Sequence, residues 1–180
     1  MTAPVTIAKT DRFKVESKTL AEPGCVELKM IGDIDENVKL DIVWDFLVQL
    51  GDEAKHIRFD VSEVGRINSV GVKGWLFFLA RVQARLSFLF MNISEAFVDQ
   101  ASLIPKMLGK PGTPVESFIA PFFCEKCKTR VAKSLKTSAI DLENFELDTL
   151  EYLCDVCRQP LEFDAVPEDY LRFLKHSLKK

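Results

Sequence analysis

The chain of 180 residues has little of what an enzyme needs for acid–base or nucleophilic catalysis. Its two histidines, His56 and His176, are isolated in the sequence and belong to no Cys-His or Ser-His-Asp grouping. A glycine-rich phosphate loop is missing, because Gly71-Val-Lys-Gly74 lacks the required spacing. The carboxylates of Asp33 and Asp35 stand before an expected helix, which favours capping over acid–base work. We therefore expect a noncatalytic protein.

Long hydrophobic runs and a secretory leader are also missing. The densest apolar stretch, Trp75 to Ala80, is far too short to span a bilayer, which predicts no membrane insertion. The first residues lack the basic and then apolar run of a signal peptide. We expect a soluble protein of the reducing cytoplasm, where paired cysteines bind metal more often than they form disulfides.

Positive charge is not in excess. The formal net charge of −3 and the pI near 5.5 argue against broad nonspecific binding to nucleic acid, which needs clustered basic charge. One basic run does exist, and an acidic run follows it. Each run is typical of a solvated face, and the two could pair with each other. The basic run is Lys126, Lys128, Arg130, Lys133 and Lys136, and the acidic run is Asp141, Glu143, Glu146, Asp148 and Glu151.

Cysteine is scarce but concentrated. Four of the five cysteines form two pairs, Cys124-Glu-Lys-Cys127 and Cys154-Asp-Val-Cys157. The two-residue gap lets one tight turn direct two thiolates at one ion, and two such turns complete a tetrahedral four-sulfur shell. A closed shell leaves no open position for a substrate. We therefore predict a structural zinc ion bound by Cys124, Cys127, Cys154 and Cys157.

The interval between the two pairs leaves alternatives open. It is 26 residues, Lys128 to Leu153, against the roughly 15–20 residues usual for such sites, so a zinc ribbon here carries a long insertion. Iron, a redox role for accessible thiolates of low pKa, two disulfides and four free thiols are the other interpretations. The fifth cysteine, Cys25, lies in a strand-like run and is expected to be a small buried apolar residue.

Hydrophobic periodicity predicts an α/β fold. Strands are expected at 13–18, 25–31, 56–61, 86–91 and 115–120, and helices at 38–50, 69–82, 94–108 and 167–178. Asp35, Asn37, Asn68 and Ser94 are expected helix starts, Gly65 a turn, and Pro105 an early end of the third helix. The sequence pattern changes after residue 120, where the first cysteine pair follows Pro121. We predict a main domain at 1–120, a zinc-ribbon β subdomain at 121–166, and a helix at 167–180 that packs back.

The junctions of the first 120 residues carry a resemblance. Gly32-Asp-Ile-Asp35 precedes the first helix, Asp60-Val-Ser-Glu-Val64 ends a strand, and Ile67-Asn-Ser-Val-Gly-Val72 enters the second helix. In order and spacing these resemble the STAS domain of anti-sigma-factor antagonists and sulfate-transporter tails. The resemblance implies a mixed β-sheet flanked by helices. It also implies a docking surface for a protein partner, such as a kinase, sensor or scaffold, with a homo-oligomer as a further option.

The chain departs from the family at its phosphorylation motif, Asp-Ser-Ser/Thr-Gly. The family's second hydroxyl residue corresponds to Val70, which has none, and its aspartate to Asn68. Ser69 matches the first serine and is expected to cap the helix. The phospho-switch is therefore expected to be absent, although phosphorylation at Ser62 or Ser69 stays open. The partner-binding surface is predicted around Asp35, Asn68, Ser69 and Val70.

Two functions follow from these features. The first is a noncatalytic signalling or scaffold module that binds a protein through the STAS-like surface. The alternative is a nucleic-acid-binding or transcription-associated protein that acts through the zinc ribbon and its basic run. The acidic run, the low pI and the lack of aromatic residues interleaved with the basic run disfavour the alternative.

Overall fold

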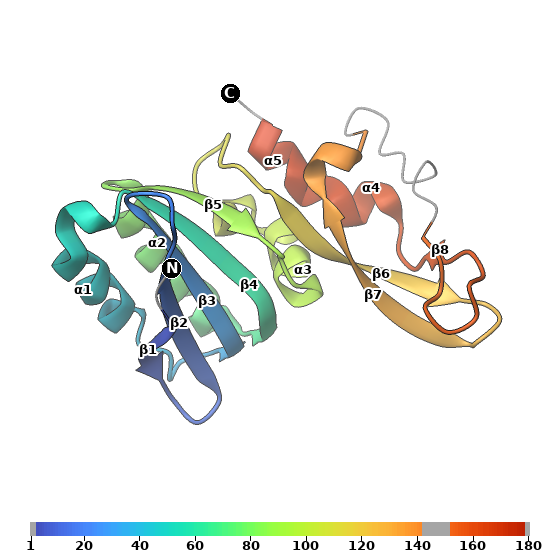
Figure 1. Cartoon of the computed structure of the whole chain (residues 1–180), viewed down its shortest axis with the longest axis horizontal. Helices are drawn as coiled ribbons and strands as arrows, with labels where there is room; N and C mark the ends of the chain where they lie inside the picture. Colours follow the sequence, from blue (N-terminus) through green and yellow to red (C-terminus); the bar gives the residue numbers. More distant parts are fainter. Residues whose placement is uncertain (1–2, 142–151, 179–180) are drawn as a thin grey trace.

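A five-stranded mixed β-sheet forms the larger part of the protein (Figure 1). The computed structural model describes residues 3–141 and 152–178. The strands lie in the order of the sequence, with β1, β2 and β3 antiparallel and β3, β4 and β5 parallel. They are β1 (Val5–Lys9), β2 (Phe13–Thr19), β3 (Cys25–Ile34), β4 (His56–Ile67) and β5 (Ser87–Met91). The helices α1 (Leu40–Leu50) and α2 (Ser69–Gln83) make the two crossovers between the parallel strands, and the predicted α/β class is confirmed.

The two faces of this sheet differ, because side chains alternate along a strand. On the inner face the register places Leu28, Phe59 and Phe90 side by side, all buried. On the outer face it aligns Glu16, Lys29 and Asp60, and Lys29 forms an ion pair with Glu63 at 2.6 Å. The helices therefore cover one face, and the other is charged.

An aromatic cluster fixes the helices to the inner face. Trp75 of α2 makes edge-on contact with Phe59, with the ring centroids 5.6 Å apart. Phe97 of α3 (Glu95–Leu103) contacts Trp75 at 5.5 Å and Phe90 at 5.8 Å. Buried aromatic pairs of this geometry add about 0.5–1.5 kcal/mol each beyond the burial of their area.

A second, three-stranded sheet extends from the edge of the first (Figure 1). Its order is β7-β6-β8, with β6 (Ser117–Cys124), β7 (Thr129–Lys136) and β8 (Glu162–Phe163). Single bridges join Phe90 to Val115 and Ile93 to Phe118, so the start of β6 continues the large sheet beside β5. We call residues 121–141 and 152–166 the cysteine lobe. The domain boundary at residue 120 stays a prediction, and β6 runs through it.

The C-terminal segment packs back onto the start of β6. It is broken into α4 (Pro167–Tyr170), a 3-10 turn η4 (Leu171–Phe173) and α5 (Leu174–Leu178), where the sequence predicted one helix. The Tyr170 hydroxyl donates to the Ile119 carbonyl at 2.6 Å, and the ring of Phe173 lies 5.3 Å from that of Phe118. These contacts hold the first half of β6 against the larger sheet.

Several local predictions need correction. Asp35 and Asn37 do not cap α1, because its N-cap is Lys39, which makes no side-chain cap bond. Gly65 lies inside β4 and not in a turn. The early end of the third helix that was expected at Pro105 is confirmed, because α3 ends at Leu103 and Pro105 starts a separate 3-10 turn, η2 (Pro105–Leu108). Two further 3-10 turns, η1 (Gly51–Glu53) and η3 (Thr137–Ala139), and strand β1 were not predicted.

Among the residues that the structure describes, none of the helices combines the length and the apolar character needed to cross a bilayer.

Candidate metal centre and the surface at the start of helix α2

The two cysteine pairs meet at the far end of the cysteine lobe. Their four sulfur atoms all lie within 4.8 Å of one another. The Sγ atoms of Cys124 and Cys157 are 3.5 Å apart, and those of Cys127 and Cys154 are 3.9 Å apart. A tetrahedral ion with Zn–S bonds of about 2.3 Å separates its sulfurs by about 3.8 Å. Both separations far exceed the roughly 2.05 Å of a disulfide, and all five cysteines of the chain are free. The cluster fits a four-sulfur metal site.

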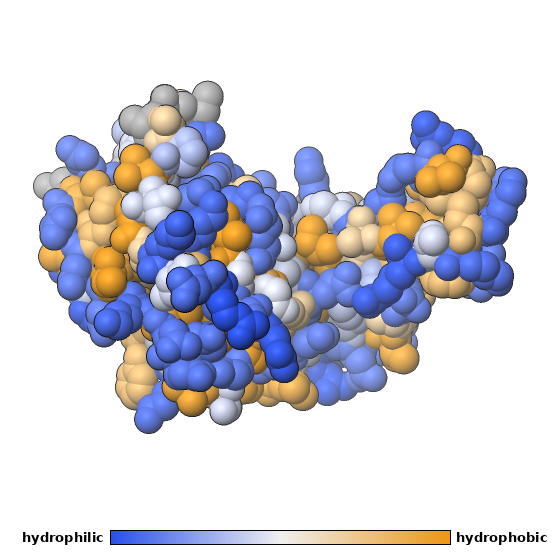
Figure 2. Space-filling model, turned by 90° about the horizontal axis from the view of Figure 1, so that it is seen from below, coloured by the Kyte–Doolittle hydropathy of each residue, from blue (hydrophilic) through white to orange (hydrophobic). Residues whose placement is uncertain are grey.

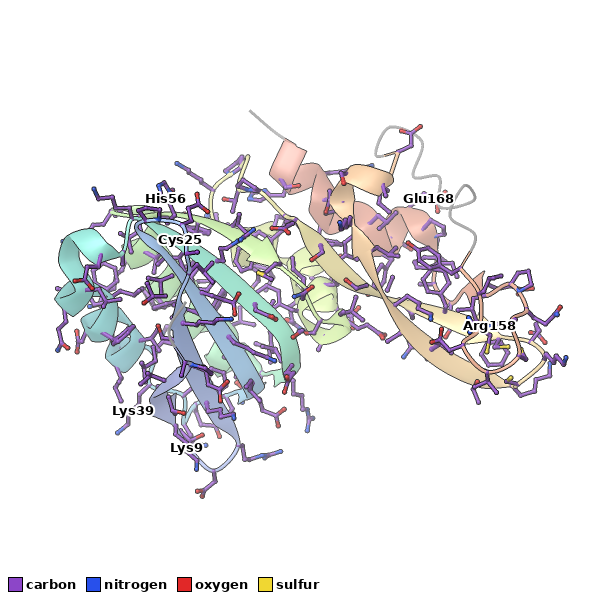
Figure 3. The ribbon with its side chains drawn as sticks, in the orientation of Figure 1. Lys9, Cys25, Lys39, His56, Arg158 and Glu168 are labelled. Carbon is purple, nitrogen blue, oxygen red and sulfur yellow. The ribbon has the colours of Figure 1, made fainter. Side chains whose placement is uncertain are left out.

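Each pair sits in the same kind of turn. The backbone N–H of Cys127 donates to Cys124 Sγ at 3.4 Å, and that of Arg158 donates to the Cys154 carbonyl at 2.9 Å. The residue after each pair has a left-handed backbone, with φ of 53° at Lys128 and 59° at Arg158. Figure 3 shows Arg158 beside the sulfur atoms. Glycine or asparagine at these positions would have signalled the turns, whereas lysine and arginine gave sequence reasoning no such signal.

The sulfurs differ in how readily they ionise. The backbone N–H groups of Cys157 and Val156 point at Cys154 and lower the pKa of its thiol to about 6. The Cys157 side chain, together with burial, raises the pKa of Cys127 to about 12. Crowded thiols thus share protons, and a central dication would replace those protons. Cys124 and Cys154 are buried, while Cys127 and Cys157 are partly exposed.

The basic run on the lobe is largely paired. Arg130 contacts Glu95 of α3 at 2.7 Å and Asp164 at 2.9 Å, and Lys133 contacts Asp155 at 2.7 Å. Lys128 pairs with Glu125. Four acids of the run that could pair with these basic residues, Glu143, Glu146, Asp148 and Glu151, lie outside the described residues. The ion pair to Glu95 joins the lobe to α3, and these pairs reduce the charge available for a nucleic-acid phosphate.

The start of α2 packs against the end of β3. The N-cap is Asn68, whose Oδ1 accepts from the Gly71 N–H at 2.8 Å, so the cap is not Ser69, the first helical residue. The Asn68 N–H donates to the Ile34 carbonyl at 3.2 Å. A Cβ on Gly71 would lie 2.0 Å from that oxygen, so glycine is what allows this close approach.

The four residues predicted to bind a partner gather around this junction. Asp35 and Val70 line one groove of about 270 Å³, and Ser69 lines a neighbouring groove of about 680 Å³. Asp35 accepts from the Asn37 N–H at 2.9 Å, and the Asn68 side chain donates to Glu36 at 2.6 Å. The surface is therefore one site formed by the end of β3 and the start of α2.

Sequence reasoning missed two members of this surface. Lys73 and Phe77 line both grooves, and Phe77 is 65% exposed. A signal was present, because Phe77 falls outside the apolar stripe of α2 that contains Val72, Trp75 and Leu79. An aromatic residue outside a buried stripe is expected to be exposed on the helix surface.

Replacing Asn68 with alanine should lower the free energy of unfolding by about 0.5–2 kcal/mol, because the Gly71 N–H loses its acceptor. Urea denaturation of the purified chain measures this. Asn68→Ser keeps a capping oxygen and is the matched control, so it should lose clearly less. Equal losses for the two variants would show that the cap bond is not what Asn68 contributes.

A second cluster of polar groups lies at the opposite end of the parallel strands. Cys25, His56 and Ser87 are in register on β3, β4 and β5, and His56 Nδ1 is hydrogen-bonded to Ser87 Oγ. Figure 3 places the labelled Cys25 and His56 together at this edge. Burial raises the pKa of the Cys25 thiol, so that sulfur is a poor nucleophile. Sequence reasoning missed this cluster because its members are 31 residues apart.

No protein-family model matches the chain, and no curated protein matches its sequence. We therefore infer the function from the geometry of the cysteine cluster and of the surface at the start of α2.

Proposed function

We propose that the protein is a noncatalytic adaptor that binds a protein partner through the surface at the start of α2. The observation that carries the proposal is a pair of exposed apolar side chains on one helix, Val70 at 54% and Phe77 at 65% exposure, beside a groove lined by Asp35. Large exposed apolar groups around a hollow are typical of protein-binding surfaces. The likeness of these junctions to the STAS domain points the same way.

The cysteine cluster supports a structural role for a metal. Four thiolates fill a tetrahedral shell, and soft sulfur ligands in this geometry favour zinc, with iron as the competing ion. The residues fit such an ion, and it would supply no open coordination position for a substrate. Elemental analysis of protein purified without added metal distinguishes the two ions and gives the stoichiometry.

A charged side chain at the centre of the surface should weaken partner binding. We expect Val70→Glu to weaken the affinity at least about tenfold, because burying an unpaired carboxylate at an interface is costly. The partner is first captured and identified from extract of the native cells at near-physiological concentration, and its Kd is then measured by calorimetry.

A matched control exists on the same chain. Val166, at the start of α4, is 58% exposed against 54% for Val70, so Val166→Glu adds the same charge at a similar exposure. It should leave the affinity unchanged. Failure to capture any specific partner, or equal losses for the two variants, would overturn the proposal.

A further inference from the structure

The larger groove beside α2 has a different chemistry from the surface at the helix start. It encloses about 680 Å³, within the range of small-ligand sites. One wall is the exposed side of α2, and the other is residues 106–111 with His176 of α5. Its apolar lining consists of Val72, Leu76, Phe77, Leu79, Ala80 and Pro111, and its polar side chains other than lysine are Ser69, Gln83 and His176.

Hydrogen bonds join the two walls and hold the second wall together. The indole N–H of Trp75 donates to the Met107 carbonyl at 2.8 Å, which joins α2 to η2. His176 Nε2 lies 3.0 Å from the Gly109 carbonyl, and the Gly112 N–H donates to the His176 carbonyl at 3.1 Å. The groove is thus preformed, so little binding free energy would be lost in ordering it around a ligand.

The charged side chains that line the groove are all lysines. Lys73, Lys106 and Lys110 line it, and none of the lining residues is acidic. Within the part of the chain that the structure describes, these three lysines enter none of the ion pairs. An apolar interior with unpaired ammonium groups complements an apolar body with an anionic end.

We propose that this groove binds a single-chain aliphatic carboxylate, with the chain along the α2 wall and the carboxylate among the lysines. This groove shares Ser69, Lys73 and Phe77 with the surface at the helix start, whereas Val70 and Asp35 line only the smaller groove. Val70→Glu therefore tests the protein-binding function without altering the lining of the larger groove. An alkyl chain makes no hydrogen bonds and matches the apolar part of the lining. An extended peptide would need a partner for each of its amide groups, and the polar side chains of the lining other than lysine are only Ser69, Gln83 and His176.

Calorimetry of the full chain with dodecyl ligands tests the proposal. The probes are dodecanoate, dodecyl maltoside and dodecyltrimethylammonium, each below its micelle concentration. They share one alkyl chain and differ in the charge of the head group. We expect dodecanoate to bind at least about tenfold more tightly than either of the others, because the lysines attract only the anion. Equal affinities, or no binding of dodecanoate, would overturn the proposal.

Two variants separate the wall from the charges. Ala80→Trp places an indole in the groove from an exposed helix position and should remove binding of all three probes. Lys106→Glu with Lys110→Glu should reverse the preference towards the cation, which a loss of folding could not do. Lys9→Glu with Lys39→Glu is the charge-matched control, because neither residue lines the groove, and it should bind as the parent does. The protein could instead prove to be a dimer that Ala80→Trp dissociates and that binds none of the amphiphiles. The groove would then be the contact between two copies of the chain, and the proposal would be overturned.

Discussion

Replacing Cys124 with serine should release the metal and unfold the far half of the cysteine lobe while the five-stranded sheet stays folded. The reason is that the apolar core of the lobe is small. The rings of Tyr152 and Phe163 lie 4.8 and 5.6 Å from that of the buried Phe122, and Leu135 is the one buried residue of β7. Figure 2 shows hydrophobic side chains on the surface of this lobe, where Leu153 and Val156 are exposed. Small units of this kind depend on a bound ion, which contributes about 10–16 kcal/mol in zinc-finger peptides.

Hydrogen exchange read by mass spectrometry locates the effect. We expect fast exchange at 121–133 and 152–163. Protection should persist at 117–120, because Tyr170 and Phe173 hold this part of β6. The limit of unfolding should therefore fall inside β6, just beyond Ile119, whose carbonyl accepts from Tyr170. Chelation of the metal from the parent protein should give the same pattern.

Cys25 provides the matched control. It is buried on β3 and lies outside the sulfur cluster, so Cys25→Ala should keep one metal per chain while costing some stability. A full metal content in Cys124→Ser would contradict the four-sulfur site. Cooperative loss of protection along the whole chain on chelation would instead show that the lobe and the large sheet share one folding unit.

Elements with strong periodicity were predictable. The stripe of α2 and the apolar run of β5 appear where the sequence indicates them. The helix buries Val72, Trp75 and Leu79, and β5, the last strand of the sheet, buries Phe90. The cysteine cluster was predictable too, because the two-residue spacing restricts where a pair of sulfurs can point. In these cases the local pattern and the tertiary contact demand the same conformation.

Elements that depend on a distant partner were not predictable. β1 has no clear alternation and is a strand because it pairs with β2. β4 continues through Gly65 because its last residues pair with β3, with Glu63 opposite Ile31 and Ile67 opposite Ile34. This pairing overrides the local turn preference of glycine. The larger groove depends on α2, residues 106–111 and α5, which are brought together only by the fold.

The surface at the start of α2 was predictable in part from a local motif and depends in part on a distant contact. Its residues at 68–70 were identified from a local motif, but what makes the surface is the contact of α2 with the end of β3. The Gly71 N–H and the Asn68 N–H are both satisfied there, by Asn68 Oδ1 and the Ile34 carbonyl. Asp35 follows Ile34 directly, so this contact also brings Asp35 and Val70 to one groove.

Gly71→Ala should therefore destabilise the protein, whereas Gly74→Ala, one turn along the same helix, should stabilise it. A Cβ on Gly71 would lie 2.0 Å from the Ile34 oxygen and 2.6 Å from its carbon, and both are backbone atoms that cannot rotate away. A Cβ on Gly74 would meet nothing within 4 Å. Overpacking of this kind costs about 1–3 kcal/mol, while alanine in an open helical position gains about 0.5–1 kcal/mol over glycine.

Urea denaturation of the two variants measures these opposite signs directly, since each introduces the same methyl group into the same helix. If the proposed protein partner binds at this surface, the Gly71→Ala variant should also bind it less tightly, because separation of α2 from β3 moves Val70 away from Asp35. Shifts of the same sign for both alanines would show that helix propensity, and not the approach to Ile34, governs this junction. The partner-binding surface would then not depend on the contact that glycine allows.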